Sequence, residues 1–255
     1  MHEGLITCPS GAKLGQVAQM LVRNRIHAVV VVDGQGAPVG VLADSDLLAG
    51  EWLATDPESF ELMQSLTAGE LMTTPVTTIH ADAPANEAAR RLQNEHLSRF
   101  VVVDDSGAVG VIAISDFVHA FARASTHPRT VADAMSRAIV VAYGDTRVPD
   151  LARGMSERRS RSVVVLDQRG RARGVVTGHD LLEADPEATA EDLMHPPITI
   201  SPTASLREAA DAMVQNEVHR LVVADPDKLH ALPLGILSSY DIVAEMAEPG
   251  SRWAS

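Results

Sequence analysis

One short motif occurs four times along the chain, and this repetition limits the folds that the chain can adopt. The copies read GVLADSDL at 40–47, GVIAISDF at 110–117, GVVTGHDL at 174–181 and GILSSYDI at 235–242. Each begins with glycine, continues with apolar residues and has an aspartate six positions after the glycine. Self-similarity at a long, regular interval is typical of repeated supersecondary units. The chain is therefore expected to contain four copies of one unit.

Each motif follows two further elements in the same order. An apolar strand that ends in aspartate precedes the glycine, as in SVVVLD at 162–167. Upstream of the strand lies an amphipathic helix, which in the fourth copy starts with a capping box formed by Ser205 and Glu208. An opening strand stands before three of the helices, as in LMTTPVTTI at 71–79. Each unit therefore reads β-α-β-β-α.

The size of the unit predicts how the copies associate. A unit of this length buries too little apolar surface to be stable alone. We therefore expect an α+β (mixed α/β) fold in which four repeats form two paired modules. The predicted modules are residues 1–124, with repeats at about 1–55 and 66–124, and residues 125–248, with repeats at about 128–185 and 188–248, followed by a tail at 249–255.

Composition and charge narrow the classes of function. The formal net charge of −13 disfavours a nucleic-acid partner, which selects for a basic surface. The apolar runs are too short to span a bilayer, the N-terminus lacks a signal-peptide core, and the single cysteine allows no intrachain disulfide. The sequence therefore predicts a cytoplasmic protein with neither a nucleic-acid nor a membrane partner.

Arginines are concentrated in one part of this acidic chain. Seven of them lie between Arg153 and Arg173, against two acidic residues, Glu157 and Asp167. Such a run forms either a solvated basic face or a local anion site. The sequence leaves both alternatives open.

The motif carries ribose and phosphate chemistry in repeats three and four. A hydroxyl residue, Thr177 or Ser238, stands three positions before Asp180 or Asp241. A carboxylate can accept two hydrogen bonds from the vicinal hydroxyls of a ribose, and a hydroxyl beside a helix N-terminus suits a phosphate. Alternatively, the aspartates serve only as N-caps, a role that would not require the hydroxyl.

Taken together, these elements resemble the cystathionine-β-synthase (CBS) repeat family, whose repeats pair into Bateman modules. The resemblance covers nearly the whole chain and rests on three elements in register: the opening segment, the apolar strand ending in Asp, and the glycine-to-aspartate motif. The fourth repeat, VHRLVVAD followed by LGILSSYDIV, resembles the nucleotide-sensing repeats of AMP-activated kinase regulatory subunits. The resemblance implies that adenosine ligands bind between paired repeats.

The family pattern also implies which residues contact such a ligand. Ser238 with Asp241, and Thr177 with Asp180, would hold ribose and phosphate, while Ile198 and Thr199 would face the adenine. The positions before the apolar strand, His27, Ser98–Arg99, Arg161 and His219–Arg220, would meet phosphates, for which arginine offers a planar fork. Alternatively, these cations only complement a helix C-terminus, and for His27 we prefer that interpretation.

The first two repeats depart from the pattern. Ala43 and Ala113 replace the hydroxyl residue, so one expected phosphate contact is missing in each. The weaker ligand-binding candidates are therefore His27, Asp46, Thr77, Arg99, Ser115 and Asp116. One of the N-terminal clefts is expected to bind only the nucleoside end of a ligand or to be structural.

Two classes of function remain. The first is a non-catalytic regulatory protein that binds AMP, ADP or ATP, or alternatively S-adenosylmethionine or NAD, and changes conformation to control a partner in energy sensing or signal transduction. The second is an oligomerisation scaffold with mostly empty clefts. No catalytic triad or metal-ligand spacing stands out, so we expect no enzyme, no metal and no obligatory cofactor. The modules could close into a disc within one chain or, as a homodimer, between two.

Overall fold

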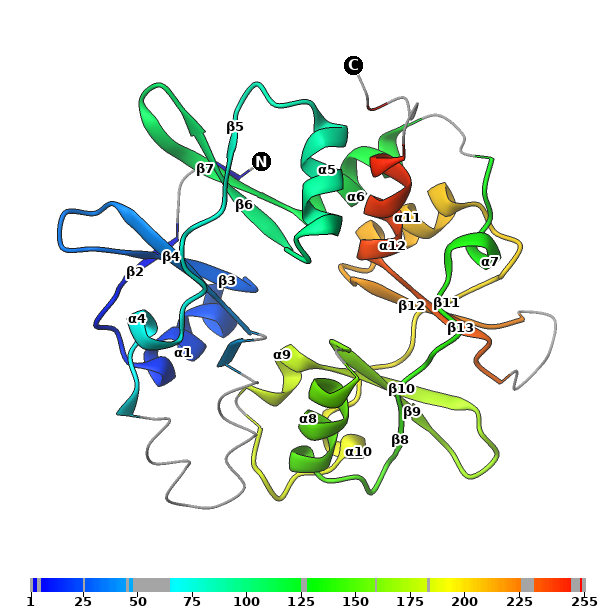
Figure 1. Cartoon of the computed structure of the whole chain (residues 1–255). Coiled ribbons are helices and arrows are strands. Elements are labelled where there is room, and N and C mark those ends of the chain that lie inside the picture. The colour runs from blue at the N-terminus through cyan, green and yellow to red at the C-terminus, as the bar shows by residue number, and fades with distance from the viewer. Residues whose placement is uncertain are drawn as a thin grey trace.

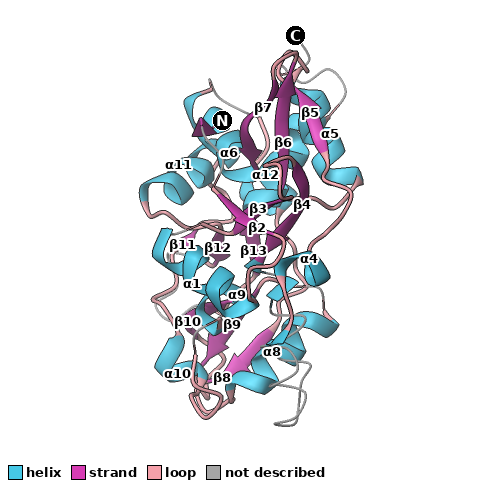
Figure 2. Ribbon diagram, turned by 90° about the vertical axis from the view of Figure 1, so that its left-hand side faces the viewer, coloured by secondary structure: helices cyan, strands magenta, loops and turns pink. Residues whose placement is uncertain are grey.

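The computed structural model describes residues 2–3, 6–24, 26–44, 46–47, 65–124, 128–158, 160–182, 184–225, 232–248 and 253. These residues form four small mixed sheets with their own helices, arranged around a common centre (Figure 1). Seen from the side, the molecule is narrower than in the view of Figure 1 (Figure 2). The predicted α+β class and the fourfold repeat are thus confirmed.

The first two repeats contain the same succession of strand, helix, strand and strand. Repeat one contains β2 (Thr7–Pro9), α1 (Leu14–Asn24), β3 (Ala28–Val32) and β4 (Pro38–Ala43). Repeat two contains α4 (Ala68–Leu71), β5 (Thr78–His80), α5 (Ala85–Asn94), β6 (Arg99–Asp104), β7 (Gly107–Ala113) and α6 (Ile114–Arg123). The N-terminal strand β1 (His2–Glu3) pairs antiparallel with β7, at the edge of the repeat-two sheet.

Repeats three and four follow the same plan. Repeat three contains α7 (Val131–Ala134), β8 (Val141–Tyr143), α8 (Val148–Glu157), β9 (Ser162–Leu166), β10 (Ala172–Thr177) and α9 (Gly178–Leu181). Repeat four contains α10 (Ala190–Leu193), β11 (Thr199–Ile200), α11 (Leu206–Gln215), β12 (Arg220–Val223), β13 (Gly235–Ser238) and α12 (Ser239–Ala247).

Strand direction follows from the connections. In every repeat the opening strand runs parallel to the apolar strand, because a helix connects the two, and the apolar strand forms an antiparallel pair with the motif strand. The aspartate that follows the apolar residues shapes the hairpin turn. The Asp33 carboxylate accepts hydrogen bonds from the backbone N–H groups of Gln35 and Ala37, both at 2.9 Å, as turn aspartates do.

The two halves of the chain meet through helices. Helix α12 packs against α5 and α6, and α11 packs against α6, so repeats two and four share one hydrophobic core. The Tyr240 hydroxyl lies 2.7 Å from the carbonyl oxygen of Leu92, and the Gln93 amide donates to the Tyr240 carbonyl at 2.8 Å. Across the molecule, Leu182 of repeat three joins the core of repeat one. One chain therefore closes the ring of four repeats.

The predicted module boundaries fall partly outside the described residues. Residues 125–127, at the predicted module boundary, and the predicted end of repeat one near residue 55 are among them. In the predicted tail, Trp253 packs against the core shared by repeats two and four, and its carbonyl accepts the Asn86 N–H at 3.2 Å. The exact boundaries therefore stay a prediction.

Candidate functional site

The motif glycines allow the opening segment of one repeat to lie directly against the motif strand of its paired repeat. A Cβ on Gly40 would lie 2.9 Å from the Thr73 carbonyl oxygen of repeat two, and a Cβ on Gly235 would lie 2.7 Å from the Ser136 carbonyl oxygen of repeat three. Gly174 is equally close to Met194 of repeat four. These close approaches, which only glycine permits, join repeat one to repeat two and repeat three to repeat four.

The motif aspartates are not N-caps, which corrects the sequence-based alternative. Ser238 and Thr177 occupy the N-cap positions, and Asp241 and Asp180 lie three residues later. Oδ2 of Asp241 accepts hydrogen bonds from both the N–H and the hydroxyl of Ser238, each at 2.7 Å. Thr177 and Asp180 repeat this arrangement at 2.6 and 2.7 Å. The hydroxyl and the carboxylate thus have a structural reason for their spacing.

The second carboxylate oxygen distinguishes the motifs. In the first repeat, Oδ2 of Asp46 accepts the Ala43 N–H at 2.8 Å, and within the described part of the chain Oδ1 accepts no hydrogen bond. The same holds for Oδ1 of Asp241. In contrast, Oδ1 of Asp180 lies 2.9 Å from Nε2 of His195. Burial raises the pKa of both Asp46 and Asp241. The hydrogen bonds that the two carboxylates accept partly offset this rise.

A cavity of about 120 Å³ lies between repeats one and two. Its polar and charged lining comes from three repeats: Asp46 from the first, Thr73, Thr77, His96, Ser98 and Arg99 from the second, and Arg161 from the third. Val41, Pro75 and Leu97 add apolar surface. The weaker candidates Asp46, Thr77 and Arg99 therefore lie together in the N-terminal module, and Arg161 reaches them from the other half of the chain.

Three arginines, Arg99, Arg161 and Arg220, lie near the centre of the molecule. None of the three has a salt-bridge partner among the described residues. Burial lowers the pKa of Arg99 to about 10, opposed by the nearby Asp44 and Asp46. Burial also lowers the pKa of Arg220 to about 10, and the charge of Arg161 adds to this effect. Arg99 and Arg220 are thus desolvated, and the exposed Arg161 lies close enough to act on both. Guanidinium groups gathered in this way favour the binding of an anion.

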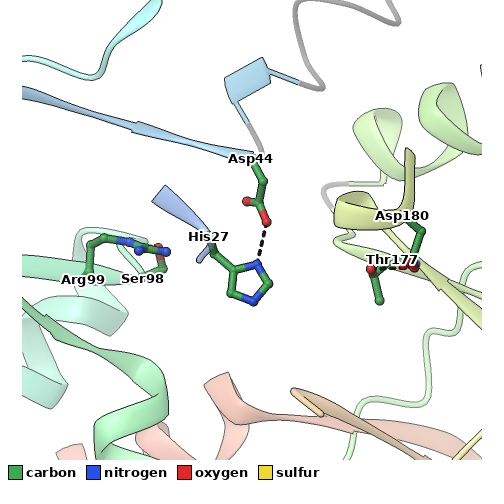
Figure 3. Close-up of polar contacts among 6 residues, drawn as sticks. All are labelled: His27, Asp44, Ser98, Arg99, Thr177 and Asp180. Atoms are coloured by element: carbon green, nitrogen blue, oxygen red, sulfur yellow. Dashed lines mark hydrogen bonds and ion pairs between the residues drawn. The ribbon is translucent and has the colours of Figure 1, made fainter. Parts of the chain in front are cut away.

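Three imidazoles lie close to one another near these arginines. The His27 ring lies 5.3 Å from that of His179 and 5.1 Å from that of His219, both edge to face. Nδ1 of His27 lies 2.9 Å from Oδ2 of Asp44. In Figure 3, Arg99 lies on one side of His27 and Asp180 on the other. The repeats thus bring His27 to the centre of the molecule, in contact with Asp44 and two further imidazoles.

His219 is held by its own repeat. Its Nδ1 lies 3.2 Å from the hydroxyl of Ser239, the residue after the motif serine. Burial, together with the neighbouring His27 and Arg220, lowers the pKa of His219 to about 4. The ring is therefore neutral at pH 7 and acts as a hydrogen-bonding group.

The remaining candidates, Ile198, Thr199, Ser115 and Asp116, lie at the ends of strands or in the first turn of a helix. Ile198 precedes β11 and packs against the core, while its carbonyl accepts the Val222 N–H at 2.9 Å. Thr199 is exposed on β11. Ser115 lies partly buried in the first turn of α6, where Oδ2 of Asp116 accepts the Ala113 N–H at 2.9 Å.

Sequence reasoning missed the partners Asp44, Ser239 and His195 and treated His179 as a variable position. Asp44 and His179 lie inside the motif, between the glycine and the aspartate. Their position at the end of the motif strand, next to the motif aspartate, was the signal that could have identified them as site residues. Nothing in the sequence indicated that two separate repeats would bring them together.

The arginine run divides into two groups. Arg153 pairs with Asp150, Arg171 with Asp167 at 2.6 Å, and Arg173 with Glu191 at 3.8 Å, as expected of a solvated face. Arg161 instead lines the cavity of the N-terminal module. The paired arginines agree with the solvated-face alternative, and an anion site at Arg161 stays a prediction.

Paired β-α-β-β-α repeats define a class of tandem-repeat proteins with clefts between the repeats. In this chain, the opening segment of one repeat lies against the motif strand of its partner, and arginines cluster near the centre. The CBS domain family model matches residues 1–51, 68–123, 131–187 and 190–248. The chain belongs to the CBS domain family, with four repeats in two Bateman modules, as the sequence resemblance predicted.

Two solved structures share the whole architecture. Protein MJ1225 of Methanocaldococcus jannaschii, which has been proposed as an archaeal homologue of g-AMPK, has a TM-score of 0.83 at 20% identity, with 96% of each chain covered. An uncharacterised conserved protein of Pyrococcus horikoshii has a TM-score of 0.67 at 18% identity, covering 96% of this chain and 97% of its own. These similarities show the fold.

Curated relatives match only part of the chain. Inosine-5'-monophosphate dehydrogenase of Mycobacterium tuberculosis is 31% identical over 137 residues, which are 53% of this chain and 23% of the dehydrogenase. The match covers less than a quarter of the length of the dehydrogenase. No helix among the described residues is long and apolar enough to cross a membrane.

Proposed function

We propose that this protein is a non-catalytic regulator that binds an adenosine-containing ligand between paired repeats. The observation that carries this proposal is the cavity of the N-terminal module, where a carboxylate with an open oxygen faces two arginines. Oδ1 of Asp46 is available to a ribose diol, and Arg99 and Arg161 are placed to receive a phosphate. Val41, Pro75 and Leu97 provide apolar contact for a purine.

The C-terminal module carries residues of the same chemistry. Asp241 has an open Oδ1, and its charge acts on Arg220, the cross-strand neighbour of Ser238. We include Asp241, Ser238 and Arg220 in this second site, with AMP, ADP or ATP as ligands. A ligand that contacts both halves of the chain would change how the modules sit together, and we propose that this change controls a partner protein.

The proposal predicts a loss of affinity in Asp46→Asn. Asparagine keeps the size of the side chain and can still accept the Ala43 N–H, but it presents an amide donor to the ribose hydroxyls. Loss of a charged hydrogen bond costs about 1.5–3 kcal/mol, or about ten- to hundredfold in affinity. Calorimetric titration with AMP in a buffer containing a chelator measures it.

The matched control is Asp133→Asn, the same change at the exposed capping-box aspartate of α7, which should bind AMP as the parent does. AMP binding that is equal in the parent and in Asp46→Asn would contradict the assignment. A thermal-shift screen with AMP, ADP, ATP, S-adenosylmethionine and NAD tests the class of function. If none of these ligands raises the melting temperature, the protein is the scaffold with empty clefts.

A further inference from the structure

A cluster of possible metal ligands lies beside the arginines and has no part in the proposed nucleotide contacts. His27, Asp44 and His179 each offer a ligand atom within 4.8 Å of the others. The pair His27 and Asp44 comes from repeat one, whereas His179 comes from repeat three. Ligand bonds of about 2.0–2.2 Å place two ligand atoms of a tetrahedral site about 3.4 Å apart, so small side-chain rotations suffice.

A second observation concerns His179 alone. Its Nδ1 is buried and, in the described part of the chain, has no hydrogen-bond partner. An unsatisfied polar atom of this kind costs about 1–3 kcal/mol, so native proteins rarely leave one without a reason. A bound ion that turns the ring toward His27 and Asp44 would remove that cost.

The surrounding charges tolerate a cation. The arginines Arg99, Arg161 and Arg220 contribute three positive charges, and the carboxylates that act on them, Asp44, Asp46 and Asp241, contribute three negative ones. The Asp44 carboxylate lies beside His27 with 14% of its side chain exposed, so it is largely shielded from water and is still accessible to an ion.

We infer that His27, Asp44 and His179 form a site for a divalent transition-metal ion of the Zn²⁺ class. Two imidazoles and one carboxylate select such ions over Mg²⁺ or Ca²⁺, which prefer oxygen ligands. Three protein ligands leave at least one coordination position for water or for an oxygen of a bound anion. Because the ligands come from repeats one and three, the ion links the two modules.

The test uses the full chain after removal of metals with a chelator and in the absence of nucleotide. Co²⁺ is the first probe, because its visible absorption reports nitrogen and oxygen coordination. Zn²⁺ is the second, titrated calorimetrically. We expect one ion per chain, a rise in melting temperature on binding, and an affinity that falls at least tenfold in His27→Ala and in His179→Ala. His119→Ala, which removes an exposed histidine of α6, is the control and should bind as the parent does.

Folding of the variants is checked by their melting temperatures without metal. Absence of Co²⁺ and Zn²⁺ binding in the parent, or equal affinity in the parent and in both folded variants, would overturn the site. Asp44→Asn gives an independent reading, because it keeps an acceptor for His27 but removes the charge; it should also weaken binding. AMP binding is measured with a chelator present, so failure of the metal site and failure of the nucleotide site are separate results.

Discussion

At the scale of single residues, Asp180 and His195 show how neighbouring repeats decide whether a carboxylate is available. The Asp180 side chain is only 14% exposed, and its two oxygens are occupied by Thr177 and by His195. Asp46 and Asp241 occupy the same motif position and keep one oxygen open. Identical motif residues therefore differ in their readiness to bind a ribose, and the difference comes from a residue of another repeat.

This contact predicts that His195→Ala improves AMP binding by the C-terminal module. Removing the imidazole frees Oδ1 of Asp180, and a pair whose histidine is 70% exposed is worth about 0.5–1 kcal/mol, or about two- to fivefold in affinity. Calorimetry on the chain that also carries Asp46→Asn isolates this module. Unchanged affinity relative to the chain with Asp46→Asn alone would show that His195 does not compete with the ligand.

At the scale of secondary-structure elements, the motif strand of each repeat is the surface on which the paired repeat is seated. The isolated bridges Val41 to Thr73, Val175 to His195 and Ile236 to Ser136 place an opening segment directly beside the motif glycine. The glycine is thus required for pairing, before any ligand is considered. This gives the repeated glycine a structural explanation that is independent of nucleotide binding.

We therefore predict that Gly235→Ala destabilises the protein. The added methyl group would lie 2.7 Å from the Ser136 carbonyl oxygen, so backbone has to move, at a cost of about 1–3 kcal/mol. Urea unfolding followed by circular dichroism measures the change. Gly154→Ala in α8 is the control: a Cβ there meets nothing within 4 Å, and alanine should add up to about 1 kcal/mol of helix stability. Equal stability of Gly235→Ala and the parent would be inconsistent with the close approach.

At the scale of the whole molecule, the two modules share their central charges. Arg161 of repeat three lines the cavity of repeats one and two, and its charge acts on Asp44, Asp46 and Arg220. The helices of repeats two and four hold the modules together through a common core. A ligand phosphate in the N-terminal cavity would therefore contact both modules.

The salt dependence of binding tests this shared site. Arg161 is exposed toward the cavity, so its attraction for a phosphate should weaken as salt is added. AMP affinity should fall more steeply with ionic strength than adenosine affinity, and Arg161→Ala should reduce that difference while leaving adenosine binding nearly unchanged. Arg153→Ala, which removes an arginine paired with Asp150 on the surface of α8, should behave as the parent does. Equal salt slopes for the parent and Arg161→Ala would place Arg161 outside the site.

Local patterns in the sequence were sufficient for the repeat unit and its family. The apolar strands, the hairpin aspartates and the capping box of Ser205 with Glu208 depend on neighbours within a few residues, and the structure contains them, with the Glu208 N–H donating to Ser205 at 3.2 Å. Register among four copies then identified the CBS domain. Short-range hydrogen bonding and periodic burial are properties that a sequence states directly.

The grouping of the site was decided only by tertiary structure. His27, Asp44 and His179 meet because repeats one and three face the same centre, and Arg161 joins Asp46 although 115 residues separate them in the sequence. The hydroxyl in front of Asp180 and of Asp241 could not be assigned to a cap or a ligand until its hydrogen bond to Oδ2 was located. Contacts of this kind depend on how packed helices orient one repeat against another, and no local pattern encodes that orientation.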